Sequence, residues 1–282
     1  MANISCIIVS YNNGEFIKQA ITSVVNQTMP INEIIVADDG STDGSREIIS
    51  SLVSEYPQIR PIFRENNLGV AANRDLAIRA ANGDLITTLD GDDFYLPEKI
   101  EQEFLAMQKS SNLIAYSSIM LVNNEQKNIG HVDTSKFCNF DQKQRLKWLA
   151  NRLGPIPRDM LLSKKLYLET NGMNHKIPVY EDWDLKIRLA AYPSNWAYSG
   201  VEGIAYRRTG FGLSTMNSIE HIKNQFEVLW LNRQIVKKHA GQWSFWEALA
   251  RVLYRNKRGL IETTPIWQVL SKARLLSFTG AK

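Results

Sequence analysis

The chain opens on the apolar run Ile4-Ser-Cys-Ile-Ile-Val9, which leads directly into the polar segment Ser10-Tyr11-Asn12-Asn13. The run is continuous rather than alternating, as expected for a strand of a parallel sheet that is covered on both faces. It predicts a buried strand whose carboxyl end carries polar side chains. Ligands of open α/β sheets bind at that end of the strands.

The same unit recurs along the first 110 residues. An apolar segment with helical spacing follows the first strand, from Phe16 to Val25. Further strands are predicted at 33–37, 59–63 and 85–89, and further helices at 43–54, 70–81 and from Pro97 onward. This alternation is typical of an α/β fold with a doubly wound, mostly parallel, Rossmann-like sheet. Two more strands are expected near 113–122 and 196–206.

The remainder of the chain differs in charge and pattern. Residues from Met216 to the end carry a net charge of +7, against −3 for the first 215, and are predicted to be helical. We therefore expect a catalytic domain over 1–215 and a basic, helical C-terminal extension over 216–282.

Composition sets further bounds. The 282 residues are 44% hydrophobic and 22% charged, which suits a globular protein with a buried core. Two cysteines, Cys6 and Cys138, do not make a disulfide framework, and no apolar run reaches 18 residues. The expectation is a cytoplasmic protein without a nucleic-acid partner.

An acidic motif, Asp90-Gly-Asp92-Asp93, follows the fourth predicted strand. Three carboxylates within four residues repel one another unless a cation neutralises them, and the glycine lets Asp90 and Asp92 face one ion. Taken alone, a solvated turn explains the motif equally well. The four histidines lack metal-ligand spacing, so carboxylate oxygens would hold the metal, which favours Mg²⁺ or Mn²⁺.

Two other acidic clusters allow both a structural and a functional interpretation. In Asp38-Asp39-Gly-Ser-Thr-Asp43, Ser41 or Asp43 would cap the next helix, but capping leaves Asp38 and Asp39 unexplained. A carboxylate there is able to accept the imide N–H of uracil or thymine. In Tyr180-Glu-Asp182-Trp-Asp184, the acids complement a helix dipole, or Asp182 acts as a general base.

Several nucleotide-binding motifs are missing. No G-x-G-x-x-G follows the first strand, and no G-x-x-x-x-G-K-[ST] occurs. Dinucleotide-binding enzymes and P-loop nucleotide triphosphatases are therefore disfavoured.

Taken in order, these segments resemble the inverting family-two glycosyltransferases of the bacterial surface-polysaccharide type, which have the A-type nucleotide-diphospho-sugar transferase fold. The resemblance runs from Ile4 to about Ser214. It rests on Val9-Ser-Tyr-Asn12, Gln27-Thr28, Ile35-Val-Ala-Asp-Asp-Gly-Ser-Thr-Asp43, Asn67-Leu-Gly69 with Asn73-Arg74, Leu89-Asp-Gly-Asp-Asp93 and Glu181-Asp-Trp183. Each piece is weak alone, but their order and spacing are specific.

The resemblance implies a nucleotide-sugar site. Tyr11 would stack on the base, and Asp39 or its neighbour Asp38 would bind the imide. Asn67 and Arg74 would lie near the nucleotide and diphosphate. The implied donor-binding set is Ser10, Tyr11, Asn12, Asp38, Asp39, Asn67, Arg74 and Asp90.

It also implies the catalytic groups. Asp90 and Asp92 match the D-x-D pair of metal ligands for Mn²⁺ or Mg²⁺, with Asp92 as the direct ligand, and Asp182 matches the catalytic base. The expected reaction is a single in-line displacement that moves a sugar, with inversion, from a UDP-sugar to a hydroxyl of a saccharide or lipid-linked acceptor.

Two departures from the family pattern refine this expectation. The Gln-x-x-Arg-Trp motif of processive synthases is missing after Asp182, which favours a single addition. Many relatives place a metal-binding histidine after Tyr-Arg-Arg, whereas here Thr209 follows Arg207 and Arg208, which leaves that extra ligand unassigned.

Two alternative functions stay open on sequence alone. A nucleotidyltransferase that makes nucleotide sugars would need Arg and Lys in a glycine-rich loop after the first strand, and 11–15 lacks them. A non-catalytic nucleotide-sugar-binding module has no need of a base such as Asp182.

The C-terminal extension has two interpretations of its own. Within 243–260, Trp246, Leu249, Leu253 and Leu260 form an apolar stripe, with Arg251, Arg255 and Arg258 on another face. In the first interpretation, the helix lies on an anionic membrane surface, here the inner face of the plasma membrane. In the second, it packs its apolar stripe on the catalytic domain.

Overall fold

A computed structural model describes residues 2–109, 112–208 and 218–255. The first half contains β1 (Ile4–Ser10), α1 (Ile17–Val25), β2 (Glu33–Asp38), α2 (Ser45–Glu55), β3 (Ile59–Phe63), α3 (Val70–Ala80), β4 (Leu85–Asp90), β5 (Phe94–Tyr95) and α4 (Lys99–Lys109). The second half contains β6 (Ile114–Val122), β7 (Asn128–Val132), the 3₁₀ turn η1 (Ser135–Asn139), α5 (Gln142–Asn151), β8 (Leu161–Ser163), α6 (Lys164–Glu169), α7 (Glu181–Ala190), β9 (Trp196–Arg207), α8 (Ser218–Leu231), α9 (Arg233–Ala240) and α10 (Gln242–Arg255).

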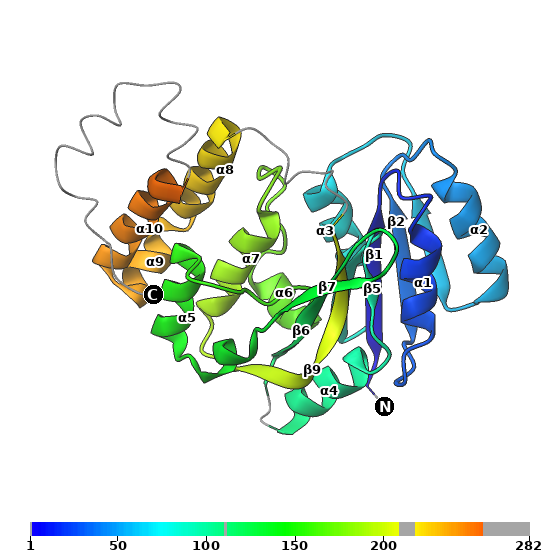
Figure 1. Cartoon of the computed structure of the whole chain (residues 1–282), viewed down its shortest axis with the longest axis horizontal. Coiled ribbons are helices and arrows are strands. Elements are labelled where there is room, and N and C mark those ends of the chain that lie inside the picture. Colours follow the sequence, from blue (N-terminus) through cyan, green and yellow to red (C-terminus); the bar gives the residue numbers. More distant parts are fainter. Residues whose placement is uncertain (1, 110–111, 209–217, 256–282) are drawn as a thin grey trace.

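One mixed sheet organises the described residues. Its strand order is β3-β2-β1-β4-β8-β6-β9-β5, with β7 paired to β6 (Figure 1). The pairs β3–β2, β2–β1, β1–β4 and β6–β9 are parallel, and the short β8 runs antiparallel between β4 and β6. The doubly wound, mainly parallel α/β fold predicted from the sequence is confirmed.

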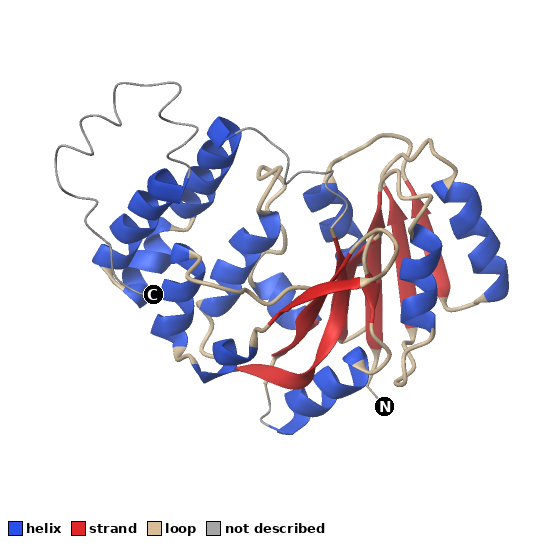
Figure 2. Ribbon diagram, in the orientation of Figure 1, coloured by secondary structure: helices blue, strands red, loops and turns tan. Residues whose placement is uncertain are grey.

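Helices cover both faces of this sheet (Figure 2). Successive side chains of β1 point to opposite faces, so Ile7 and Val9 join one buried cluster and Cys6 and Ile8 join the other. The first cluster includes residues of α3, α5 and α7, and the second includes residues of α1, α2 and α4. Every residue of β1 is buried, which explains why its sequence is apolar without alternation.

The helices α8, α9 and α10 pack beside α5 and α7 on the first of these faces (Figure 1). In α10 the buried positions are Ser244, Phe245, Ala248, Leu249 and Val252, so the helix packs on the protein with a different stripe from the predicted one. Only Leu249 belongs to both stripes; Trp246 is half-exposed. Leu260 and Arg258, which completed the predicted pattern, lie outside the described residues.

Among the described residues, no helix combines the length and apolarity needed to cross a membrane.

Candidate active site

Strand register brings the polar strand ends to one edge of the sheet. Ser10 at the end of β1 pairs with Asp38 of β2, and Val9 pairs with Asp90 of β4. The loop after β4 then presses on β1, because a Cβ added at Gly91 would lie 2.9 Å from the Val9 carbonyl oxygen. Glycine is the residue that permits this close approach. The acidic motif is thus held against the end of β1.

The three carboxylates of that motif gather around one point. Oxygen atoms of Asp90, Asp92 and Asp93 lie within 4.8 Å of one another, close enough to share a cation. Burial and then the charge of Asp90 raise the pKa of Asp92, and burial raises the pKa of Asp93 well above its ordinary value. Among the described residues, no other side chain bonds the Asp92 carboxylate, whereas Asp90 and Asp93 have arginine partners. Asp92 is therefore the carboxylate available to a metal ion.

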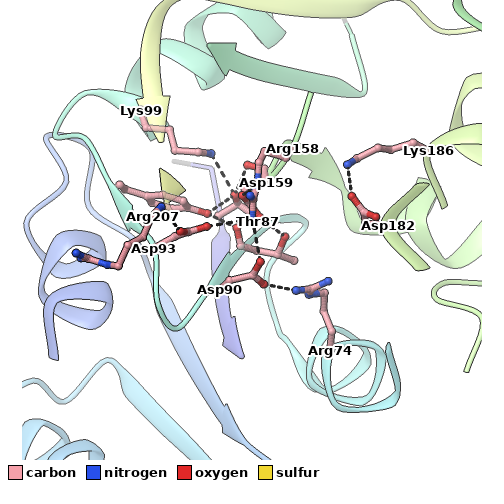
Figure 3. Close-up of polar contacts among 12 residues, drawn as sticks. Arg74, Thr87, Asp90, Asp93, Lys99, Arg158, Asp159, Asp182, Lys186 and Arg207 are labelled. Atoms are coloured by element: carbon pink, nitrogen blue, oxygen red, sulfur yellow. Dashed lines mark hydrogen bonds and ion pairs between the residues drawn. The ribbon is translucent and has the colours of Figure 1, made fainter. Parts of the chain in front are cut away.

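Arg158, which sequence analysis did not single out, is the main counter-ion of this loop (Figure 3). Its guanidinium lies 2.8 Å from Asp90 and 3.0 Å from Asp93, and its Nε donates to Asp159 at 2.8 Å. The planar group stacks on Tyr206, 4.2 Å from the ring centroid. Burial alone would lower the pKa of Arg158, but these carboxylates raise it well above the ordinary value. A single fixed cation thus contacts two of the three acids of the motif and offsets part of their negative charge.

A second arginine bridges two acids. Arg74 on α3 is buried and ion-pairs with Asp90 and, at 3.0 Å, with Glu181 at the start of α7. Burial raises the pKa of Glu181 to about 7, although Arg74 opposes this shift. Arg74, predicted to lie near the diphosphate, is in this structure a link between β4 and α7.

Asp182, the predicted base, projects from the first turn of α7. Its side chain is 47% exposed, and its carboxylate accepts from Lys186 Nζ at 2.6 Å (Figure 3). Burial would raise the pKa of Asp182, but the positive charges of Lys186, Arg158 and Arg74 together outweigh burial and lower it below the ordinary range. Asp182 also shifts the pKa of Asp90, so the base candidate and the acidic loop share one electrostatic environment. At neutral pH, Asp182 is a carboxylate able to accept a proton.

Asp38 and Asp39 have different surroundings. Asp38 is fully buried and accepts from the Ser41 N–H at 3.0 Å and from Arg46 Nε at 2.9 Å. Asp39 accepts the N–H groups of Leu68 and Gly69, both at 2.9 Å, so it holds the 66–69 loop at the rim. Each oxygen of Asp39 keeps a second lone pair. Of the two, Asp39 is better placed to meet an external donor.

The helix after this segment begins later than predicted. Gly44 has a φ of 89°, a left-handed conformation that does not continue a helix, so α2 starts at Ser45. Of the two predicted caps, Asp43 bonds the Ser45 N–H at 3.1 Å and the Gly14 N–H at 2.8 Å. Ser41 instead donates its hydroxyl to Asp38.

The remaining predicted donor-site residues line the same rim. Tyr11 is 50% exposed, and Asn12, with a φ of 53°, accepts the Thr42 N–H at 2.9 Å. Ser10 is buried, and its hydroxyl has no hydrogen-bond partner among the described residues. Asn67 is exposed and accepts the Gly69 N–H at 2.9 Å.

Arg207 supports the acidic loop from β9. Its backbone N–H donates to Asp93 at 2.8 Å and its Nε to the Asp92 carbonyl at 2.8 Å, and the residue is buried. Arg207 therefore stabilises the loop instead of facing solvent. Arg208 is exposed and lies over the Tyr206 ring, 4.9 Å from its centroid.

The family model for glycosyl transferase family 2 matches residues 5–168, more than half of the chain. The chain belongs to this family.

Curated relatives and a solved structure are also similar to this chain. An uncharacterized glycosyltransferase of Haemophilus influenzae is 35% identical over 140 residues, which cover 50% of this chain and 56% of the relative. The chondroitin synthase of Pasteurella multocida is 28% identical over 241 residues, 84% of this chain but 24% of that protein. The chain thus spans about half, or less, of the length of these curated relatives. Structurally, S. aureus TarS 1–349 in complex with UDP-GlcNAc aligns with a TM-score of 0.72 and 17% identity, over 89% of this chain and 71% of that chain, which shows a shared fold.

Proposed function

We propose that the protein is a metal-dependent, inverting glycosyltransferase that uses a UDP-sugar and makes single additions to a saccharide or lipid-linked acceptor. One observation carries the proposal. The carboxylate of Asp92, which no other side chain bonds in the part of the chain that the structure describes, and the half-exposed carboxylate of Asp182 belong to one electrostatically linked site at the carboxyl edge of the sheet. A binding module would need the first group but not the second.

The acidic loop suits a divalent cation, because no other side chain of the described residues bonds the Asp92 carboxylate and its oxygens lie near those of Asp90. Asp92, with Asp90, would hold Mn²⁺ or Mg²⁺, oxygen-preferring ions of the type that such sites take. A bound divalent ion would offset the negative charge that develops on a diphosphate leaving group. Arg158 already offsets part of the acidic charge, so the cation needs to neutralise only the remainder.

The base would act on the acceptor side. Asp182 takes the proton from an acceptor hydroxyl as the hydroxyl oxygen bonds to the anomeric carbon of the sugar. The bond from that carbon to the diphosphate oxygen breaks, and its electron pair leaves with the nucleotide. One displacement from the opposite face inverts the anomeric configuration. Lys186 holds the Asp182 carboxylate in place before the acceptor binds.

Tyr11 and Asp39 would hold the nucleotide. Tyr11 offers an exposed ring at the end of β1, and Asp39 offers free lone pairs to an imide N–H, as found in uracil. TarS, which shares the fold, has been crystallised with UDP and with UDP-GlcNAc. Ser10, Asn12, Asn67 and Arg74 would complete the donor site, while Asp38 would act by holding the rim through Arg46.

Residues 1–215 would form the catalytic domain and 216–282 an extension, whose described helices α8, α9 and α10 pack on that domain. We infer further that the extension holds the enzyme reversibly on the anionic inner face of the plasma membrane. The predicted basic face offers little support, because Arg251 pairs with Glu247 at 2.9 Å and Arg255 bonds backbone carbonyls. Better support comes from Trp230 and Trp243, 53% and 85% exposed, since aromatic side chains favour membrane interfaces.

Co-sedimentation with liposomes tests the membrane proposal. Binding should require anionic lipid, weaken with salt and fall in the Trp230→Ser, Trp243→Ser double variant. Leu105→Ser, at an exposed residue of α4, is the matched control. Equal binding of the double variant and the control would refute a role for these tryptophans.

A donor screen tests the proposed reaction against its alternatives. The protein is mixed with Mn²⁺ and individual UDP-, dTDP- or GDP-sugars, with and without saccharide acceptors, and in parallel with a nucleoside triphosphate and a sugar phosphate. Free nucleotide, consumption of the triphosphate and binding of each nucleotide sugar are measured. Release of UDP supports a glycosyltransferase, consumption of a nucleoside triphosphate with a sugar phosphate indicates a nucleotidyltransferase, and tight binding without turnover indicates a binding module.

A further inference from the structure

A pocket lies where the C-terminal helices meet the loop after α5. It has a volume of about 430 Å³ and is lined by Arg152, Gly154, Ile156, Gln225 and Arg255. The first three belong to the loop after α5, and the last two come from α8 and α10, which pack together in Figure 1. This arginine pocket plays no part in the nucleotide site described above.

Its two arginines have no acidic partner among the described residues. The Arg152 guanidinium lies over the rings of Tyr180 and Trp183, 5.1 and 5.4 Å from their centroids. Arg255 donates to the backbone carbonyls of Asn151 and Arg152, at 2.9 and 2.6 Å. The described lining thus contains two cations and no anion, an arrangement that a bound anion would stabilise.

The charges around Arg255 agree with this description. Burial, together with the nearby charges of Arg152 and Arg251, lowers the pKa of Arg255. The single acid of α10, Glu247, bonds Arg251 at 2.9 Å and lies 3.7 Å from Lys147. No carboxylate of α10 is therefore left for Arg255.

The loop that carries Arg152 is held in place. A Cβ at Gly154 would lie 2.5 Å from the ring of Trp148, whose Nε1 donates to the Pro155 carbonyl at 3.0 Å. Arg152 itself has a φ of 47°, a left-handed conformation that its surroundings must hold. The same loop ends at Arg158 in the acidic site. The pocket is preformed and joined to that site by a short, packed segment.

Tyr180 connects the pocket to the catalytic base. Its hydroxyl bonds His221 Nδ1 at 2.7 Å and Gln225 Nε2 at 3.1 Å, both from α8. Tyr180 precedes Asp182 by two residues, a span of at most about 7 Å. Because Arg152 and Gln225 contact Tyr180, the pocket borders the segment that leads into Asp182, on the side formed by the C-terminal helices.

We propose that the arginine pocket binds an anionic group, a phosphate or a carboxylate, of the saccharide acceptor and so directs an acceptor hydroxyl to Asp182. This inference rests on the proposed function, because it assigns the acceptor side of that same site. Guanidinium groups suit it, since they pair with carboxylates and phosphates through two parallel hydrogen bonds. The Gln225 amide supplies a neutral polar contact at the buried end.

Calorimetric titration tests this assignment with three related sugars: glucose, glucuronate and glucose 6-phosphate. The donor site is first saturated with UDP and Mn²⁺ so that the sugars cannot bind there. At least one anionic sugar should bind about tenfold or more tightly than glucose, the value of one charge-assisted hydrogen bond. Comparison of the two anionic sugars shows whether phosphate or carboxylate is preferred.

Variants locate the effect. Arg255→Gln and, separately, Arg152→Gln should remove the preference for anionic over neutral sugars, and Arg255→Lys should keep part of it. Arg251→Gln is the control: this residue lies on the same helix but outside the pocket, so the full preference should remain. Thermal unfolding checks that each variant is folded. Equal binding of neutral and anionic sugars, equal loss in Arg251→Gln, or binding of anionic vesicles but of no anionic sugar would overturn the proposal.

The two proposals fail separately. If UDP with Mn²⁺ does not bind, the proposed function fails, and the same sugar titrations without nucleotide still decide whether the arginine pocket selects anions. If UDP binds and a UDP-sugar is turned over but no anionic preference appears, the pocket assignment fails alone.

Discussion

Asp182→Asn removes the proposed base, but it also breaks the ion pair with Lys186. The Lys186 side chain is 7% exposed, and Asp182 is its one ion-pair partner among the described residues. The Asn side chain has nearly the same size but neither accepts the acceptor's proton nor neutralises Lys186. A loss of activity alone would therefore not separate catalysis from structure.

The two effects have different magnitudes. Loss of a general base lowers the rate about 10²–10⁴-fold. Breaking a buried ion pair from one side costs about 3–5 kcal/mol of stability, but solvent screens a carboxylate that is 47% exposed, so we expect about 1 kcal/mol. Asp182→Asn should thus remain folded at 25 °C and bind UDP with Mn²⁺ normally.

Lys186→Met is the matched control, because it removes the same ion pair and leaves the base. Without Lys186, the pKa of Asp182 should rise toward the ordinary aspartate value of about 3.9, which makes it a stronger base. Transfer rates at saturating donor, measured with UDP affinity and thermal stability, should stay within about tenfold of wild type. Equal losses in both variants, or near wild-type transfer by Asp182→Asn, would refute the assignment of Asp182 as base.

Three further predictions concern the charges around it. Asp92→Asn should weaken the Mn²⁺-dependent binding of UDP, measured by calorimetry, by at least about tenfold. EDTA should have the same effect on the wild type, whereas the control Asp84→Asn, at the other end of β4, should leave UDP binding unchanged. Arg158→Gln leaves Asp90, Asp93 and Asp159 without their main counter-ion. Chemical denaturation in EDTA should therefore show that the free energy of unfolding falls by about 2 kcal/mol, and Mn²⁺ should stabilise this variant more than wild type. Equal stabilisation by Mn²⁺ would contradict the role of Arg158 as counter-ion. Because the folded-state pKa of Glu181 is raised from 4.5 to about 7, its contribution to stability is complete below pH 4.5 and is lost as pH rises through 7. The stability of wild type minus that of Glu181→Gln should therefore fall by about 3 kcal/mol between those pH values, and a constant difference would exclude the shift.

The fold was predictable because its central strands are buried on both faces. The run Ile4–Val9 and the strand–helix alternation after it follow directly from that burial. In contrast, β8 has three residues, too few to show a period, and it forms by pairing with β4 and β6. The antiparallel insertion, and with it the placement of Arg158, depends on tertiary contacts that the local sequence does not encode.

The candidate site was predictable to a similar degree. Residues at strand ends meet because parallel strands end at one edge, as the pairing of Ser10 with Asp38 illustrates. Ion-pair partners were not apparent, since Arg74 and Glu181 are 107 residues apart. Lys186 carried a signal that was overlooked: it follows Asp182 by four residues on a helix, the spacing at which side chains meet.

The configuration of the released sugar tests the proposed mechanism most directly. A UDP-sugar with the α configuration at its anomeric carbon is incubated with the protein and Mn²⁺. The first product, a glycoside or a free sugar, is followed by proton NMR before the anomers of the free sugar equilibrate. A single displacement with Asp182 as base predicts a β product that forms with Mn²⁺ and not in EDTA. An α product, or equal turnover in EDTA, would contradict the account.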